Sequence, residues 1–187
     1  MSDRMEELIL IEPKLEYEKQ AREYVNEFNE ENVSEIPGGS GIEKYSYIEW
    51  LKKLELGKRK ETVVENRVPA HTYFLLRTMD NNVLGVINIR HELNDYLLRE
   101  GGHIGYSIKK SERQKGYATK LLELGLEKCF ELGIDNALVT CDKNNIGSSK
   151  TIQNNLGVLE NEYQSEDGIT LRYWIDVKET LNKEKSK

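Results

Sequence analysis

The stretch HIGYSIKKSERQKGYATKLLELGLEKCFELG, residues 103–133, decides most about the fold of this chain. Residues 103–110 are predicted as a strand, and residues 117–132 carry apolar side chains at helical spacing. Gly116 stands directly before that helix, which needs no glycine in order to start. The first-turn N–H groups of a helix lack intrahelical partners, and the helix dipole is positive there. We therefore infer that an anion approaches the backbone at Gly116.

The residues around Gly116 exclude two common kinds of phosphate-binding loop. Arg113, Lys115 and Lys120 add positive charge nearby. The sequence fits neither the G-x-x-x-x-G-K-S/T nucleotide loop nor the G-x-G-x-x-G dinucleotide loop. On spacing alone, a plain strand-to-helix turn that binds nothing is the alternative.

Over the whole chain, predicted strands outnumber predicted helices, and hairpins lie on both sides of a β-α-β unit. This order predicts an α/β fold of mixed α+β type, with one mixed sheet and helices on both faces. We expect one domain over residues 1–187 and a frayed, charged tail from residue 181. The predicted strands are 8–13, 72–79, 83–93, 103–110, 135–142, 158–164 and 169–177, and the predicted helices are 14–31, 45–57, 117–132 and 144–155; residues 36–41 and 94–102 are predicted as connections.

Composition excludes several classes of function. The net charge of −6 and pI of about 5.3 argue against nucleic acid as a partner. No run approaches 18 apolar residues, and the first residues do not resemble a signal peptide, so we expect no membrane span and a cytoplasmic protein. Cys129 and Cys141 are expected to be buried free thiols. His71, His91 and His103 have no paired spacing, which gives no case for a metal site.

Two further motifs carry a resemblance to a known family. RQKGYA, residues 113–118, fits the Arg/Gln-x-x-Gly-x-Gly/Ala signature of the GNAT superfamily of N-acetyltransferases. ALVTCDKNNIGSSKTIQNNLGVLE, residues 137–160, is similar to that family's next strand and helix. The resemblance covers residues 72–177 well and residues 1–71 only in outline. It implies a mostly antiparallel sheet of about six to seven strands, in which two central parallel strands splay apart.

The resemblance also implies acetyl-CoA as the acetyl donor, with no metal. Backbone groups of Tyr106, Ser107 and Ile108 would pair with the pantetheine amides, as an added strand would. Asn145 would contact the pantetheine arm or the substrate. The pyrophosphate would lie on the loop made of Arg113, Gln114, Lys115, Gly116, Tyr117, Ala118 and Thr119.

The sequence offers several candidates for the catalytic groups. His103 stands where many family members carry Glu, and its ordinary pKa suits a general base. The alternative is that His103 is only a polar strand residue on the solvent side, which strand parity decides. His91 and Glu92 compete for the role of base, whereas His71 is expected in a loop. A tyrosine general acid is usual at the position of Ile152, so this chain departs from the family pattern. Tyr163 and Tyr173 are possible substitutes, and unassisted departure of the thiolate is another possibility.

The acceptor side is expected around residues 38–50. An acidic, aromatic rim would suit a cationic amine, although Tyr47, Trp50, Leu51 and Leu54 can equally be helix core. The acceptor stays open among a small amine, an antibiotic and a protein amino group, and the protein is expected to be a monomer or homodimer. A non-catalytic acyl-CoA-binding domain is the alternative function. The rim candidates are Glu35, Glu43, Tyr45, Tyr47, Glu49 and Trp50.

Overall fold

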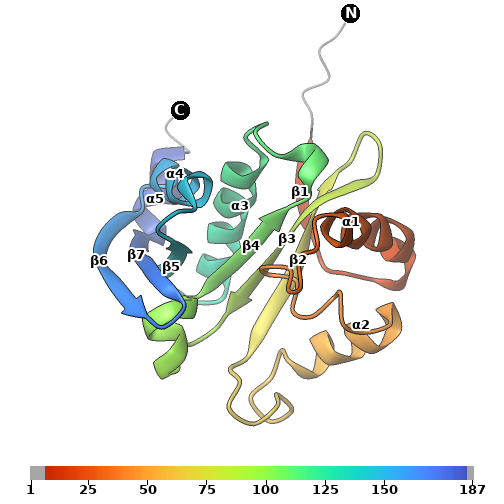
Figure 1. The fold of residues 1–187 in the computed structure, drawn as a ribbon, viewed down its shortest axis with the longest axis horizontal. Helices are drawn as coiled ribbons and strands as arrows, with labels where there is room; N and C mark the ends of the chain where they lie inside the picture. Colours follow the sequence, from red (N-terminus) through yellow and green to blue (C-terminus); the bar gives the residue numbers. More distant parts are fainter. Residues whose placement is uncertain (1–6, 185–187) are drawn as a thin grey trace, which may run out of the picture.

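A computed structural model describes residues 7–184, which form a seven-stranded sheet in the order β1-β2-β3-β4-β5-β7-β6 (Figure 1). Every neighbouring pair is antiparallel except β4 and β5, which run parallel. The predicted fold class is therefore confirmed. The strands are β1 Leu8–Ile11, β2 Ala70–Arg77, β3 Asn82–Arg90, β4 Ile104–Ile108, β5 Asn136–Asp142, β6 Val158–Ser165 and β7 Gly168–Asp176.

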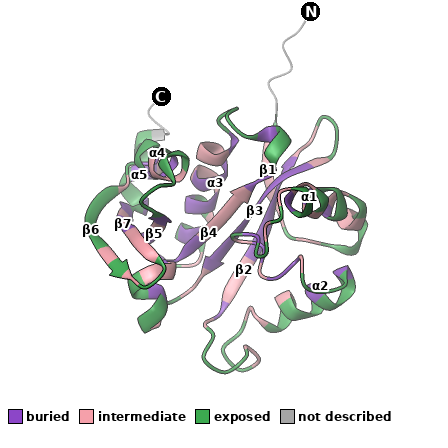
Figure 2. Cartoon of the chain, in the orientation of Figure 1, coloured by how far each residue is buried: buried purple, intermediate pink, exposed green. Residues whose placement is uncertain are grey.

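Helices cover both faces of this sheet. Helices α1 (Glu18–Glu30) and α2 (Tyr47–Leu56) pack on one face, and α3 (Tyr117–Glu131), α4 (Ile146–Asn154) and α5 (Val177–Glu184) lie on the other. Figure 2 shows buried residues on the central strands and on the inner sides of the helices. Since both sheet faces are covered, the central strands are apolar on both sides.

Alternation along β2 shows how the two cores are separated. Phe74 and Leu76 pack with α1 and α2, whereas Tyr73 and Leu75 pack with α3. A residue's parity in its strand therefore decides which helical layer it contacts. The same rule places the side chains of the candidate site.

Two local predictions were wrong, and a third was incomplete. The tail was predicted to fray, but residues 177–184 form α5, because Val177 is fully buried and Asp176 accepts the Glu179 N–H at 2.8 Å as a cap. Residues 185–187 lie outside the described part. His71 was expected in a loop but lies within β2. The connection 94–102 contains a π-helical turn at Leu97–Gly101.

Other local predictions are confirmed. Gly125 allows close packing of α3 on the sheet, since a Cβ there would lie 2.4 Å from Cδ1 of Ile87 on β3. Cys129 and Cys141 are both free and buried. Burial raises the pKa of the Cys141 thiol to about 11, so this side chain is an uncharged core residue at neutral pH.

Candidate active site

The sheet opens between its two parallel strands. β4 and β5 pair only at Ile104 and Val139, although β4 continues to Ile108 and β5 to Asp142. The strands therefore diverge toward their carboxyl ends. This splay leaves one edge of β4 without a strand partner beside it, which is where an extended ligand could add.

The loop before α3 lies at the open end of this splay. Residues 113–116 are exposed, and Gln114 and Gly116 both have positive φ values, of 63° and 84°. Gly116 is the N-cap of α3, and no side chain caps the helix there. A Cβ at Gly116 would meet nothing within 4 Å, so the backbone conformation rather than crowding favours glycine. The first-turn amides of α3 therefore have no side-chain cap, and their role as an anion site stays a prediction.

Ion pairs fix the position of the loop before α3. Buried Glu112 pairs with Lys115 at 2.8 Å and with Arg77 of β2 at 3.2 Å. Both cations lower the pKa of the Glu112 carboxyl, although its burial opposes them. The loop is therefore positioned before any ligand binds.

Arg113 makes contacts that belong to the fold. Its Nη1 and Nη2 donate to both carboxylate oxygens of Glu31 after α1, at 2.9 and 2.7 Å, and its Nε donates to the Ile108 carbonyl at 3.0 Å. The side chain thus joins the loop to α1. Because its charge is already shared with Glu31, little of it is left for a ligand.

Replacing Arg113 by Ala should raise the Kd for acetyl-CoA modestly, by about fivefold at most, because partly exposed ion pairs are worth roughly 0–1 kcal/mol. Calorimetry measures this. A double variant, Arg113→Ala with Glu31→Gln, separates loss of the side chain from the effect of leaving Glu31 unpaired. Complete loss of binding in both variants would show that the arginine, and not the amides, dominates.

The residues expected to line the pantetheine alternate between the two faces of β4. The Tyr106 hydroxyl lies 2.8 Å from Ser148 Oγ on α4, and burial raises its pKa to about 12. Ser107 points the other way, donating to the Pro37 carbonyl at 2.6 Å. Their backbone groups lie at the splay, and their roles toward a cofactor stay predictions.

Two asparagines organise α4. Asn145 is its N-cap, with Oδ1 accepting the Ser148 N–H at 3.0 Å, so capping already explains this residue. Sequence reasoning missed Asn155, which is buried and donates to the carbonyls of Thr119 and Thr151. Asn155 ties α4 to the first turn of α3. The only signal for it was a polar residue at the end of an amphipathic helix.

The loop between α1 and α2, residues 31–46, lies across β4. Gly38 contacts Gly105 so closely that a Cβ on Gly38 would be 2.4 Å from the Gly105 carbonyl oxygen. Trp50 is fully buried beneath the loop and donates its indole N–H to Gly39. Tyr47 is also buried, whereas Tyr45 is 47% exposed. The helix-core alternative is therefore confirmed for Tyr47 and Trp50.

A family model described as an acetyltransferase (GNAT) domain matches residues 14–157. The chain belongs to the GNAT acetyltransferase family. The splay, the amide loop before α3 and the loop over β4 are thus features of a GNAT domain in this chain. No curated protein matches the sequence.

Solved structures agree with the fold of this GNAT chain. The spermidine/spermine N-acetyltransferase SpeG from Vibrio cholerae has a TM-score of 0.62 at 17% identity, over 95% of this chain and 98% of that one. The microcin self-immunity acetyltransferase MccE, solved with acetyl-CoA and AMP, scores 0.61 at 16% identity, over 90% and 91%. A ribosomal-protein alanine acetyltransferase from Vibrio fischeri scores 0.62 at 15% identity, over 94% and 96%.

His103 of this GNAT chain lies directly before β4 and is 8% exposed. Its Nδ1 accepts the backbone N–H of Leu138 on β5 at 2.9 Å, so the neutral ring carries its proton on Nε2. Burial, and then the charge of Arg90, lower the pKa of His103 to about 4. To act as a base at Nδ1, the ring must first release Leu138. The role of general base stays a prediction.

Neutral His103 should make the fold sensitive to acid. Between pH 6.5 and about 4 the unfolded chain protonates this side chain and the folded chain does not, so stability falls as pH falls. The difference in pKa corresponds to about 3 kcal/mol. Urea unfolding at pH 7 and pH 4 measures how much free energy of unfolding is lost on acidification. We expect this loss to be smaller in His103→Gln than in the wild type by about that amount. Equal losses would contradict the buried neutral state.

The other candidate acids and bases have contacts of their own. His91 Nε2 lies 2.7 Å from His71 Nδ1, and Glu92 pairs with Lys60 at 3.7 Å on the surface. Ile152 is fully buried in the core next to α3. Tyr173 lies 2.8 Å from Ser149 Oγ on α4, and Tyr163 is on the outer strand β6. Tyr106 and Tyr173 therefore each place a hydroxyl within hydrogen-bond distance of a serine on α4.

The acids expected to form a rim for a cationic amine differ in their contacts. Glu49 accepts from Ser46 in a capping box at the start of α2. Glu35 and buried Glu43 each lie 3.7 Å from Lys44 Nζ. One lysine is therefore shared by two of these acids, and both carboxylate oxygens of Glu43 are buried without a hydrogen-bond partner among the described residues.

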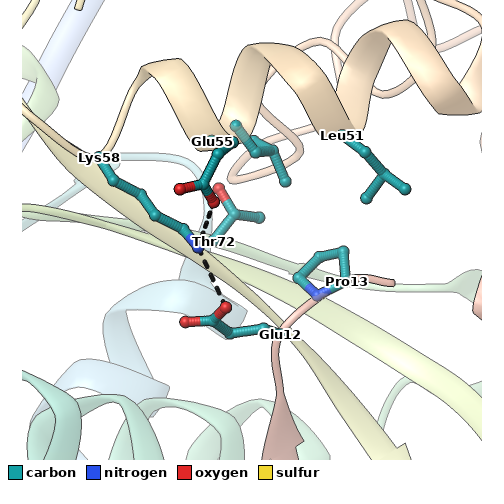
Figure 3. Close-up of a pocket in the computed structure, with 7 residues that line it drawn as sticks. Glu12, Pro13, Leu51, Glu55, Lys58 and Thr72 are labelled. Carbon is teal, nitrogen blue, oxygen red and sulfur yellow. Dashed lines mark hydrogen bonds and ion pairs between the residues drawn. The ribbon is translucent and has the colours of Figure 1, made fainter. Parts of the chain in front are cut away.

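A cavity of about 190 Å³ lies apart from these groups, between α2 and the end of β1 (Figure 3). Lys58 bridges Glu12 at 3.0 Å and Glu55 at 2.9 Å across it. None of its lining residues belongs to β4 or to the loop before α3. Over residues 7–184, no cluster of three or more potential metal ligands occurs, and no helix is long and apolar enough to cross a membrane.

Proposed function

We propose that this chain is an N-acetyltransferase that uses acetyl-CoA as the acetyl donor and an amine as the acceptor, with residues 1–187 acting as one catalytic domain. One observation carries the proposal: an exposed, uncapped amide loop at residues 113–116 lies beside a strand, β4, whose edge is left open by the splay from β5. An anion site next to an unpaired strand edge suits a ligand with a diphosphate and an amide-bearing arm.

The residues present fit this co-substrate. The amides of residues 114–119 would hold the pyrophosphate, since Gly116 leaves open space where a side chain would stand. Backbone groups of Tyr106, Ser107 and Ile108 would bind the pantetheine arm, and Asn145 would lie near it at the start of α4. The acyl end of the arm would then reach Gly105, under the loop between α1 and α2.

Acetyl-CoA supplies a thioester whose carbonyl carbon forms a bond to the amine nitrogen as the carbon–sulfur bond breaks. The loop between α1 and α2, which contacts Gly105 through Gly38, would position the acceptor and exclude water. A backbone N–H at the splay would stabilise the developing oxyanion. The amine must lose a proton, to His103 or to water, and the Tyr106 hydroxyl held by Ser148 is a candidate source of a proton for the thiolate.

The test is release of free thiol from acetyl-CoA with a panel of primary amines, including polyamines, amino acids and short peptides. Turnover on any of them supports the enzyme. The specific observation favouring the alternative, a non-catalytic acyl-CoA-binding domain, is buried Ile152 at the position of the usual tyrosine. Tight binding of acetyl-CoA by calorimetry, with no thiol released on the whole panel, would establish that alternative.

A further inference from the structure

An arginine without an acidic partner lies beside this site. Arg90 ends β3, and its Nη1 donates to the carbonyls of Gly101 and Gly102, at 2.8 and 3.1 Å. Across residues 7–184 Arg90 forms no ion pair with a carboxylate, and no carboxylate shifts its pKa. Buried cations are normally paired, since an unpaired charge away from water is costly. Arg90 therefore carries a charge that the fold itself does not neutralise.

The unused side of this guanidinium faces the start of the splay. A Cβ built on Gly105 would lie 3.2 Å from Nη2 of Arg90 and 3.4 Å from the Gly38 nitrogen. Nη2 is thus next to the point where β4 leaves β5 and under the loop between α1 and α2. Within the described chain, neither Nη2 nor Nε has a hydrogen-bond partner, and neither is sealed from solvent. Both can donate to a ligand.

Two further cations lie near Arg90 or in the loop beside it. Burial lowers the pKa of Arg90, Tyr96 opposes this effect, and the charge of Arg67 lowers the pKa further. Lys53 donates to the Ser40 carbonyl at 2.6 Å, within the loop that covers β4. Glu35 and Glu43 both lie 3.7 Å from the same cation, Lys44, and not at Arg90. At Arg90 itself, an anion would meet favourable charge.

We propose that Arg90 is a specificity-determining residue that binds a carboxylate of the acceptor, so that the acceptor is a primary amine bearing a carboxylate close to its nitrogen. This proposal rests on the proposed function. The planar guanidinium can give two parallel N–H bonds to a carboxylate, which places the amine relative to β4 as well as adding affinity. A free amino acid and a peptide with an acidic residue near its N-terminus share this chemistry.

The decisive experiment compares matched amines in the thiol-release assay. Amino acids are paired with their carboxamides, and dipeptide amides with Asp in second place are paired with dipeptide amides having Asn there, so that only the first of each pair carries a carboxylate; spermidine is the polyamine. We expect a preference for the carboxylate of about 10- to 100-fold in kcat/KM, the range for a hydrogen bond to a charged group. A preference among free amino acids or among dipeptides identifies which source is used. Equal rates for acid and amide would overturn the proposal.

Variants assign the preference to Arg90. Arg90→Gln should abolish it mainly through KM, with the Kd for acetyl-CoA unchanged, and Arg90→Lys should restore part of it. Lys60→Gln, which removes an exposed cation paired with Glu92, should leave it intact. If Arg90→Gln slows acids and amides equally, Arg90 is only structural; thermal melting checks that each variant folds.

A binding measurement separates failure of this proposal from failure of the proposed function. If no amine is acetylated, N-acetylaspartate and its diamide are titrated into the protein with CoA present. Binding of the acid alone, lost in Arg90→Gln, supports the carboxylate site without catalysis. Equal binding of both compounds, or no binding of either, overturns it.

Discussion

Gly116→Glu should raise the Kd for acetyl-CoA by about 100-fold while leaving the sheet and α3 folded. Two effects add. A glutamate at φ 84° is strained and will distort the amide loop. Its carboxylate also lies where the pyrophosphate would bind, and like charges about 4 Å apart near a surface repel by several kcal/mol. Calorimetric titration of acetyl-CoA into wild type and variant measures the change.

The matched control is Gly133→Glu. Gly133 follows α3, has a φ of 77° and, like Gly116, has open space where a Cβ would be. A glutamate at this position therefore brings the same backbone strain and the same charge to the opposite end of α3. Gly133→Glu should bind acetyl-CoA with nearly wild-type affinity. If Gly116→Glu also keeps its affinity, the pyrophosphate is held elsewhere.

Gly38→Ala should lower kcat/KM for the acceptor by about 10- to 100-fold with little change in the Kd for acetyl-CoA. The new Cβ would lie 2.4 Å from the Gly105 carbonyl oxygen and 2.8 Å from Tyr106 Cα, and backbone atoms cannot move aside cheaply. The loop between α1 and α2 must therefore lift from β4. A displacement of about 1 Å in a positioning element can cost 10²-fold in rate. Thiol release and calorimetry measure the two quantities separately.

Gly41→Ala provides the comparison within the same loop. Gly41 has a φ of 84°, but its Cβ would meet only the ends of the Lys53 and Tyr45 side chains, at 3.1 and 3.2 Å, which can move aside. It should lose stability through strain yet keep most of its activity. Equal losses of activity in Gly38→Ala and Gly41→Ala would mean that loop strain, and not contact with β4, limits the reaction.

The elements of the fold could be predicted from sequence because their signals are local. The apolar spacing of residues 117–132 and the glycine before them specify a helix with an open N-terminus, and the structure places α3 at Tyr117–Glu131. Alternating and apolar runs specified the strands, including the hairpin of β6 and β7. The tail was different, because α5 exists through Val177 packing on a core that its own charged sequence does not reveal.

The candidate site depended on contacts between distant parts of the chain. The sequence by itself determined the amide loop at residues 113–116 and the strand beside it, since these are adjacent in the chain. Tertiary structure decided that Gly38 contacts Gly105 and that the Leu138 N–H donates to Nδ1 of His103. It also decided that Arg90 donates to backbone carbonyls and pairs with no carboxylate. The first depends on where the loop between α1 and α2 crosses β4. The other two depend on strand register, where a slip of one residue would turn the side chain to the other face.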